Sequence, residues 1–179
     1  MRRFSRRGEK PPADVLQHAR LPRGERLLAA ARATDGTWLL GTRVALVLVR
    51  PQGQAQRLAW EDVAHADWDR EQDRLRVVEL AEFGVAPVVH ELAIEDPGLV
   101  LDLVRERVTA SVLLTRRVPV EPRRGLTVVA RRAPGGRDPV TWSYELDSGL
   151  DPDDPLVRAA AEQGLRSARE ELGLDPEGR

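Results

Sequence analysis

The stretch DGTWLLGTRVALVLV, from Asp35 to Val49, most constrains how this chain can fold. Asp35-Gly36 tolerates positive φ and lies between the apolar runs 27–31 and 38–40, a pattern typical of a tight β-hairpin. A second turn then leads into the consecutive apolar residues Val44–Val49. Such a run indicates a strand that is covered on both faces or crosses the middle of a small barrel. The stretch therefore predicts the first three strands of an antiparallel meander.

More strand patterns follow at regular spacing. Apolar or alternating runs separated by turn residues predict strands at 56–60, 64–68, 74–80 and 88–93. With the first three they make about seven short strands, and closing them into a barrel would remove most exposed sheet edges. A helix is predicted to follow as far as Val112, with Asp96 as its N-cap and Pro97 at its first position.

Three phrases within residues 24–112 resemble the pleckstrin-homology-like fold, including its bacterial versions. They are GERLL at 24–28, TWLLGTR at 37–43 and LAWEDV at 58–63. The whole chain also resembles an actinobacterial protein family of unassigned function that has such an N-terminal domain. The resemblance implies an α+β fold in which an antiparallel split barrel is capped by one helix.

The same resemblance bears on phosphoinositide binding. Eukaryotic members that bind phosphoinositides place Lys and Arg in the loop between the first two strands, where this chain has Thr34-Asp35-Gly36. The final helix of such domains usually carries a Trp, and residues 97–112 contain none. We therefore expect that this chain does not bind phosphoinositides.

A second lobe is predicted after Val112. Residues 113–120, 126–131 and 140–146 are expected to form a small β-meander, the last with a clean period of two. The final helix is expected to begin near Asp154-Pro155. Its apolar side is rich in Ala and Gly, and Gly173-Leu174 is a plausible Schellman stop.

Length and composition bound the organisation of the chain. Its 179 residues are enough for one domain with a core and a small second lobe. Cysteine is absent, which excludes disulfides and thiolate sites and favours a cytoplasmic location, and no apolar run approaches a membrane span. The expected parts are a basic flexible tail (1–20), the barrel with its capping helix (21–112), a strand-strand-strand-helix extension packing on the barrel (113–174) and a tail (175–179).

The spacing of the acidic residues and histidines does not match known catalytic or metal-binding motifs. Asp67–Asp73 has acids at alternate positions, but an EF-hand loop needs Gly and Glu where Gln72 and Val78 stand. His90 and Glu91, as neighbours on a strand, point to opposite faces. The histidines are isolated in the sequence: His18, His65 and His90. We therefore predict no catalytic residue, no metal, no cofactor and no enzymatic activity, although a folded pocket around a perturbed histidine would favour catalysis.

Charge is distributed unevenly along the second lobe. Residues 113–137 hold seven Arg and one acid, whereas residues 145–177 hold ten acids and three Arg. One hypothesis is a surface for nucleic acid or another polyanion, with Trp142 and Tyr144 nearby for stacking. Its residues would be Arg116, Arg117, Arg123, Arg124, Arg131 and Arg132, with Arg137 following. We favour the alternative, in which these Arg pair with the C-terminal helix and its flanks, because the opposite charges nearly cancel.

A small barrel that lacks a set of catalytic residues most often functions by binding a partner at its surface. The sequence therefore predicts a non-catalytic protein that binds another protein or a peptide, or serves as a scaffold. An exposed strand edge that joins a partner's strand is the expected mode. Polyanion binding through residues 116–137 is the alternative.

Overall fold

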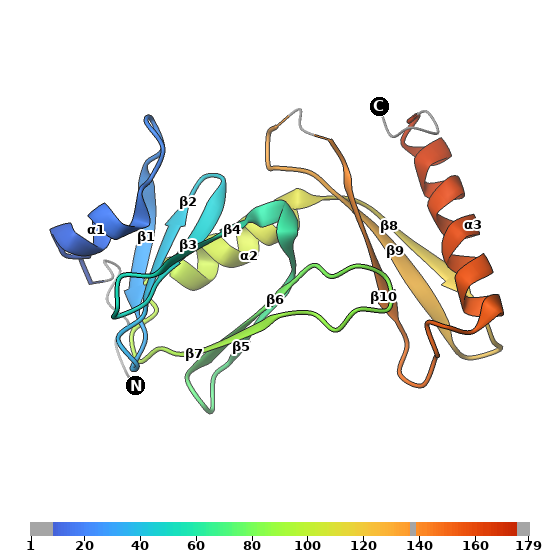
Figure 1. The fold of residues 1–179 in the computed structure, drawn as a ribbon, viewed down its shortest axis with the longest axis horizontal. Coiled ribbons are helices and arrows are strands. Elements are labelled where there is room, and N and C mark those ends of the chain that lie inside the picture. Colours follow the sequence, from blue (N-terminus) through green and yellow to red (C-terminus); the bar gives the residue numbers. More distant parts are fainter. Residues whose placement is uncertain (1–8, 137–138, 175–179) are drawn as a thin grey trace.

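The computed structural model describes residues 9–136 and 139–174 and has the expected α+β character (Figure 1). Within these residues the strands form three antiparallel sheets, ordered β1-β2-β3-β4, β5-β6-β7 and β10-β9-β8. The sheets do not close into a barrel, so the predicted barrel closure is not observed. The elements are α1 (Ala13–Ala19), β1 (Leu27–Arg32), β2 (Trp38–Thr42), β3 (Ala45–Val49), β4 (Ala55–Ala59), η1 (Trp60–Asp62), β5 (Val63–Asp69), β6 (Arg74–Glu79), β7 (Val89–Ala93), α2 (Val100–Ser111), β8 (Val112–Pro119), β9 (Gly125–Arg131), β10 (Thr141–Leu146) and α3 (Pro155–Glu171).

The predicted hairpin forms between β1 and β2, which pair antiparallel with Ala30 opposite Leu40. Gly36 at the turn has a φ of +86°, a conformation that glycine adopts without a steric cost. The Asp35 carboxylate accepts a hydrogen bond of 2.8 Å from the Thr37 backbone N–H. Every residue of β3 is buried, which confirms the prediction of a strand covered on both faces.

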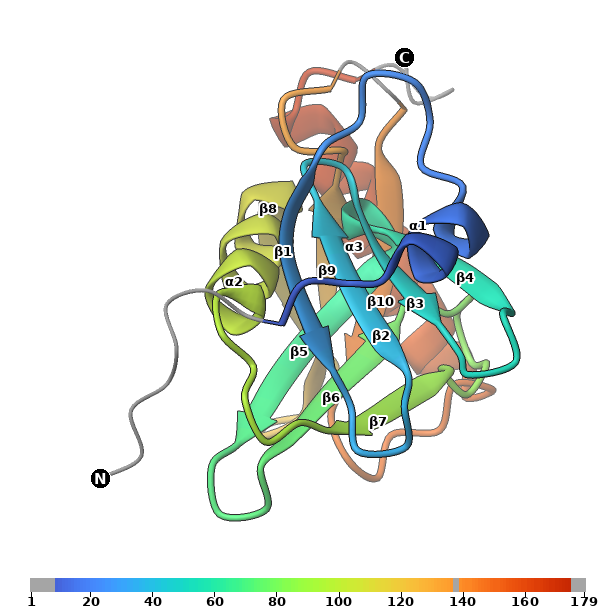
Figure 2. The same ribbon diagram turned by 90° about the vertical axis from the view of Figure 1, so that its left-hand side faces the viewer.

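Different elements cover the two faces of the first sheet. On the inner face, Leu39 and Leu46 join a core with the second sheet and α2. On the outer face, Trp38 packs with Val15 and Ala19 of α1, and Figure 2 shows this helix over β3 and β4. The prediction of a tail over residues 1–20 is therefore wrong for 13–19, because the apolar side of this short helix buries against the sheet. Residues 1–8 and 175–179, also predicted as tails, lie outside the described residues.

Helix α2 begins three residues later than a Pro97 start would place it. The predicted N-cap Asp96 is wrong: its carboxylate accepts a hydrogen bond of 3.3 Å from the Gly98 backbone N–H, and Gly98 has a φ of +51°. This turn delays the helix to Val100, which is buried in the first core. Leu103 of α2 packs close to β2, where a Cβ on Gly41 would lie 2.4 Å from its Cδ2.

The second lobe consists of β8, β9 and β10 with α3 packed on one face (Figure 1). The predicted start of α3 is confirmed, because the Asp154 carboxylate accepts a hydrogen bond of 2.7 Å from the Leu156 backbone N–H. The predicted Schellman stop is also confirmed: Leu174 N–H donates to the Arg169 carbonyl, and Gly173 has a φ of +66°. This lobe has its own core, separate from that of the first lobe.

Phe83 and Arg131 both make contacts between the lobes. Phe83, from the loop between β6 and β7, packs edge to face on Tyr144 of β10, with ring centroids 5.3 Å apart. Arg131 of β9 reaches back to the end of α2 and to β5. In the described ranges 9–136 and 139–174, no helix has the length and apolar character needed to cross a membrane.

Candidate ligand groove between the lobes

A groove with a volume of about 490 Å³ lies where the two lobes meet. One wall comes from β5, the end of β6 and the loop 80–88, and the other comes from β10 and the segment that follows it. Figure 1 shows that this long loop reaches across from the first lobe to β10. The contact between Phe83 and Tyr144 holds the loop in this position.

The loop 80–88 exposes an unusual amount of apolar surface. All its residues are apolar except Glu82 and Gly84. Val85, which lines the groove, is 57% exposed, and Val88 on the same loop is 55% exposed. Exposed apolar residues that line one groove, as Val85, Ala86 and Pro87 do, mark binding sites more often than isolated exposed side chains do.

Strand β10 is an edge strand beside the groove. It pairs with β9 alone, and among the described residues no backbone hydrogen bond joins its other edge to another segment. Residues 143–146 of the strand line the groove. An unpaired edge presents a row of N–H and C=O groups that can pair with another extended chain.

The charged lining of the groove is acidic. Its described residues include no Lys or Arg, and its carboxylates are Glu79, Glu82, Glu145 and Asp147. Glu82 and Glu145 are exposed. A cleft with carboxylates of one sign and apolar walls raises the local concentration of cations, so it favours a ligand that is both basic and apolar.

Glu79 is held by neighbours from other strands. The buried His90 ring of β7 lies with Nε2 at 2.5 Å from Glu79 Oε1, and Gln56 Nε2 donates to the same oxygen at 2.8 Å. Burial raises the pKa of the nearby Asp62, and the charge of Glu79 raises it further. Among the residues the structure describes, no group of three or more His, Asp or Glu is placed to hold a metal ion.

Of the three histidines, all within the described residues, only His65 lines the groove. Its Nε2 lies 3.2 Å from Arg76 Nη1 and 3.6 Å from an Asp67 carboxylate oxygen. The Tyr144 hydroxyl is an unsuitable base, because burial raises its pKa and keeps it protonated at neutral pH. The carboxylates of the groove are therefore the groups that attract cations.

Asp147 forms a bidentate ion pair with Arg117 in the second lobe. Arg117 donates to both of its carboxylate oxygens, and the Gly125 backbone N–H donates to Oδ2 at 2.9 Å. These interactions, the Arg117 side chain first, lower the pKa of Asp147 from its ordinary value of 3.8 to about 2. The pairing ties β8 to the segment that follows β10 and fixes one end of the groove.

This pairing predicts a specific acid sensitivity. Because the folded-state pKa of Asp147 is depressed, its ionised form stabilises the fold above pH 3.8, and this stabilisation is lost as the pH falls from about 4 toward 2. We expect Asp147→Asn to reduce stability at neutral pH and to flatten the fall in urea midpoint over that pH range. Glu162→Gln, at an exposed site on α3, is the matched control and should retain the wild-type slope. Equal slopes for Asp147→Asn and wild type would contradict the assignment.

The arginines predicted to form a polyanion surface are not gathered on one free surface. Arg116 pairs with Glu171 at 2.6 Å, and Arg124 donates to Glu121 and to the Gly149 carbonyl. The Arg116 and Arg117 pairs agree with the expected pairing to the C-terminal helix and its flanks, whereas Arg124 pairs with Glu121 of its own segment. Arg123 is exposed, Arg132 is partly buried, and Arg137 lies outside the described residues.

Arg131 is buried, so its place in the polyanion hypothesis is wrong. The residue is 4% exposed, and its Nη1 donates to the Ser111 hydroxyl at 3.0 Å and to the Val108 carbonyl at 3.3 Å. Its Nη2 donates to the Ala64 carbonyl of β5. Burial lowers the pKa of Arg131, and the Glu145 charge opposes that change. The side chain links three elements and is inaccessible to nucleic acid.

Comparisons with protein-family models, curated proteins and solved structures found no match. The function must therefore be inferred from the residues of this chain. The sequence contained one overlooked signal for the groove: the run Leu80–Val88 is too apolar for an ordinary solvent-exposed loop. No pattern in the neighbouring residues indicated that this loop would lie beside β10.

Proposed function

We propose that this chain is a non-catalytic protein that binds an extended peptide segment of a partner protein. The segment would pair with the free edge of β10 and lie in the groove beside the loop 80–88. The observation that carries this proposal is the combination of an unpaired strand edge with exposed apolar side chains in one groove.

The lining of the groove specifies the kind of peptide. Backbone hydrogen bonds to β10 would supply affinity, and alternate side chains would supply specificity. Val85 offers an apolar contact, while Glu82 and Glu145 favour Lys or Arg. We therefore infer that the bound segment alternates apolar and basic residues.

We further propose that residues 21–112 form a pleckstrin-homology-like split barrel. The order of the elements supports this proposal: a four-stranded sheet precedes a three-stranded sheet, and α2 follows both. The shared core between these two sheets and α2 supports it as well. Such a scaffold does not itself assign a partner.

Selection from a displayed library of random peptides against the full chain tests the proposed function. We expect enriched peptides to alternate apolar residues with Lys or Arg, and to bind less tightly as salt rises. Val85→Ser should weaken binding about five- to tenfold, because burying one valine side chain contributes roughly 1–1.5 kcal/mol. Glu82→Lys should weaken binding further for the most basic peptides. Fluorescence anisotropy of the enriched peptides gives the dissociation constants.

Matched variants separate the groove from the rest of the surface. Val88→Ser changes a valine of the same loop that lies outside the groove lining, and Glu162→Lys reverses an exposed charge on α3. Both should bind the enriched peptides as the wild type does. Acidic enriched peptides, or equal losses for Val85→Ser and Val88→Ser, would refute peptide binding in this groove.

A further inference from the structure

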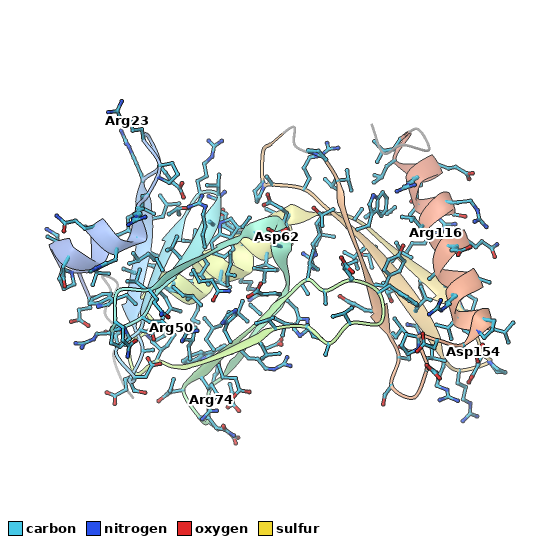
Figure 3. All side chains as sticks on the ribbon, viewed as in Figure 1. Arg23, Arg50, Asp62, Arg74, Arg116 and Asp154 are labelled. Carbon is cyan, nitrogen blue, oxygen red and sulfur yellow. The ribbon has the colours of Figure 1, made fainter. Side chains whose placement is uncertain are left out.

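A second pocket, with a volume of about 570 Å³, lies on the first lobe away from the groove. Its arginines come from three segments: the turn before β1, the turn between β2 and β3, and the last turns of α2. They are Arg23, Arg26, Arg43 and Arg107. Figure 3 shows Arg23 at the outer tip of the segment before β1.

The pocket has a single carboxylate, and that group is already engaged. Glu25 accepts two hydrogen bonds from Arg57, at 2.9 and 3.0 Å, and one from the Thr42 hydroxyl at 2.5 Å. Its side chain is only 8% exposed. Arg57 lies outside the pocket lining and already balances the charge of Glu25, so the four lining arginines leave the pocket with a net positive charge.

Three of the lining arginines are exposed, and the fourth has one guanidinium nitrogen without a hydrogen-bond partner. The exposed side chains are those of Arg23, Arg26 and Arg43. Arg107 is partly buried, lies 3.4 Å from the exposed Glu106 carboxylate, and has a buried Nε without a hydrogen-bond partner. Several guanidinium groups facing one hollow repel one another, and a bound anion would relieve that repulsion.

The pocket also has an apolar part. Leu28 is 47% exposed, and Pro22 and Val44 line the same hollow. A guanidinium group donates two parallel hydrogen bonds to a phosphate, and a phosphate dianion balances several arginines better than a carboxylate does. The lining is therefore complementary to an anion that combines phosphate with a hydrophobic group.

We propose that this pocket binds a phosphate monoester that carries an apolar group. Arg43 and Arg107 hold the phosphate, and Leu28 contacts the apolar portion. The site is independent of peptide binding in the groove, because the two cavities share no lining residue.

Calorimetric titration of the full chain with phenyl phosphate, at constant ionic strength and pH 7.5, tests the proposal. Benzoate is the monoanionic comparison and should bind more weakly. Arg43→Gln and Arg107→Gln should each lower the affinity for phenyl phosphate about tenfold, as expected for losing a charge-assisted hydrogen bond. Arg105→Gln changes an exposed arginine of α2 outside the pocket and should leave the affinity unchanged.

Two vesicle samples distinguish the source of the ester. The protein is sedimented with phosphatidylcholine vesicles that contain phosphatidic acid, and with vesicles of phosphatidylcholine alone. A lipid phosphate is identified if the protein sediments only with the phosphatidic acid vesicles and Arg43→Gln abolishes that sedimentation. Binding of phenyl phosphate without sedimentation would identify a soluble ester. The proposal is overturned if phenyl phosphate does not bind at millimolar concentration, if benzoate binds equally well, or if Arg105→Gln weakens binding as much as Arg107→Gln.

Discussion

Replacing Arg131 by alanine is expected to destabilise the protein by about 2–4 kcal/mol. The change removes the donors for the Ala64 carbonyl and the Ser111 hydroxyl in a site with little access to water, while the Val108 carbonyl keeps its hydrogen bond from Ser111. It also creates a cavity between the lobes. Urea unfolding followed by circular dichroism measures the loss.

Two further substitutions identify the cause of this loss. Arg131→Met fills the volume without donating hydrogen bonds, so it should recover only the part of the stability that is due to packing. Arg132→Ala, at the next position of the chain, should cost less than about 1 kcal/mol because that side chain is only partly buried. If Arg131→Ala and Arg132→Ala unfold at the same urea concentration, Arg131 does not join the lobes as described.

Replacing Gly164 by leucine is expected to cost about 3 kcal/mol, through overpacking between α3 and its sheet. A Cβ at this position would lie 2.6 Å from a Val118 methyl group and 2.9 Å from a Val128 methyl group. Valine side chains cannot easily rotate away, because branching at Cβ restricts χ1. The helix must therefore shift away from β8 and β9. Thermal unfolding should show the change as a lower midpoint, by about 2–4 °C per kcal/mol.

The matched control for Gly164→Leu is Ala159→Leu, at an exposed position of the same helix. Leucine and alanine are both good helix formers, so this control should stay within about 0.5 kcal/mol of the wild type. Amide hydrogen exchange of α3 adds a local measurement, because a displaced helix exchanges faster in Gly164→Leu alone. If Gly164→Leu is as stable as Ala159→Leu, α3 does not need a glycine at its contact with the sheet.

Local patterns predicted most of the secondary structure. The Asp35-Gly36 turn, the buried strand Ala45–Val49, the Asp154 cap and the Gly173 stop all depend on residues within a few positions of one another. The start of α2 and the presence of α1 were predicted wrongly, and both errors have local causes. Gly98 supports a turn that uses the Asp96 carboxylate, so the helix begins later, and α1 is too short to give a convincing helical period.

The candidate sites depended on contacts between distant segments. The groove combines the loop 80–88 with β10, and the second pocket combines Arg43 with Arg107. Sequence spacing placed Arg131 in an apparent basic cluster, but packing of the second lobe against α2 and β5 buries it.

The sequence by itself determined the α+β class, the two-part organisation and most strand and helix positions, because apolar periodicity and turn residues act over short distances along the chain. Only the tertiary structure decided which edge strand lies beside the groove, which arginines are neutralised and where the lining residues converge. Those properties arise from burial and pairing between segments far apart in sequence, and no local pattern encodes them.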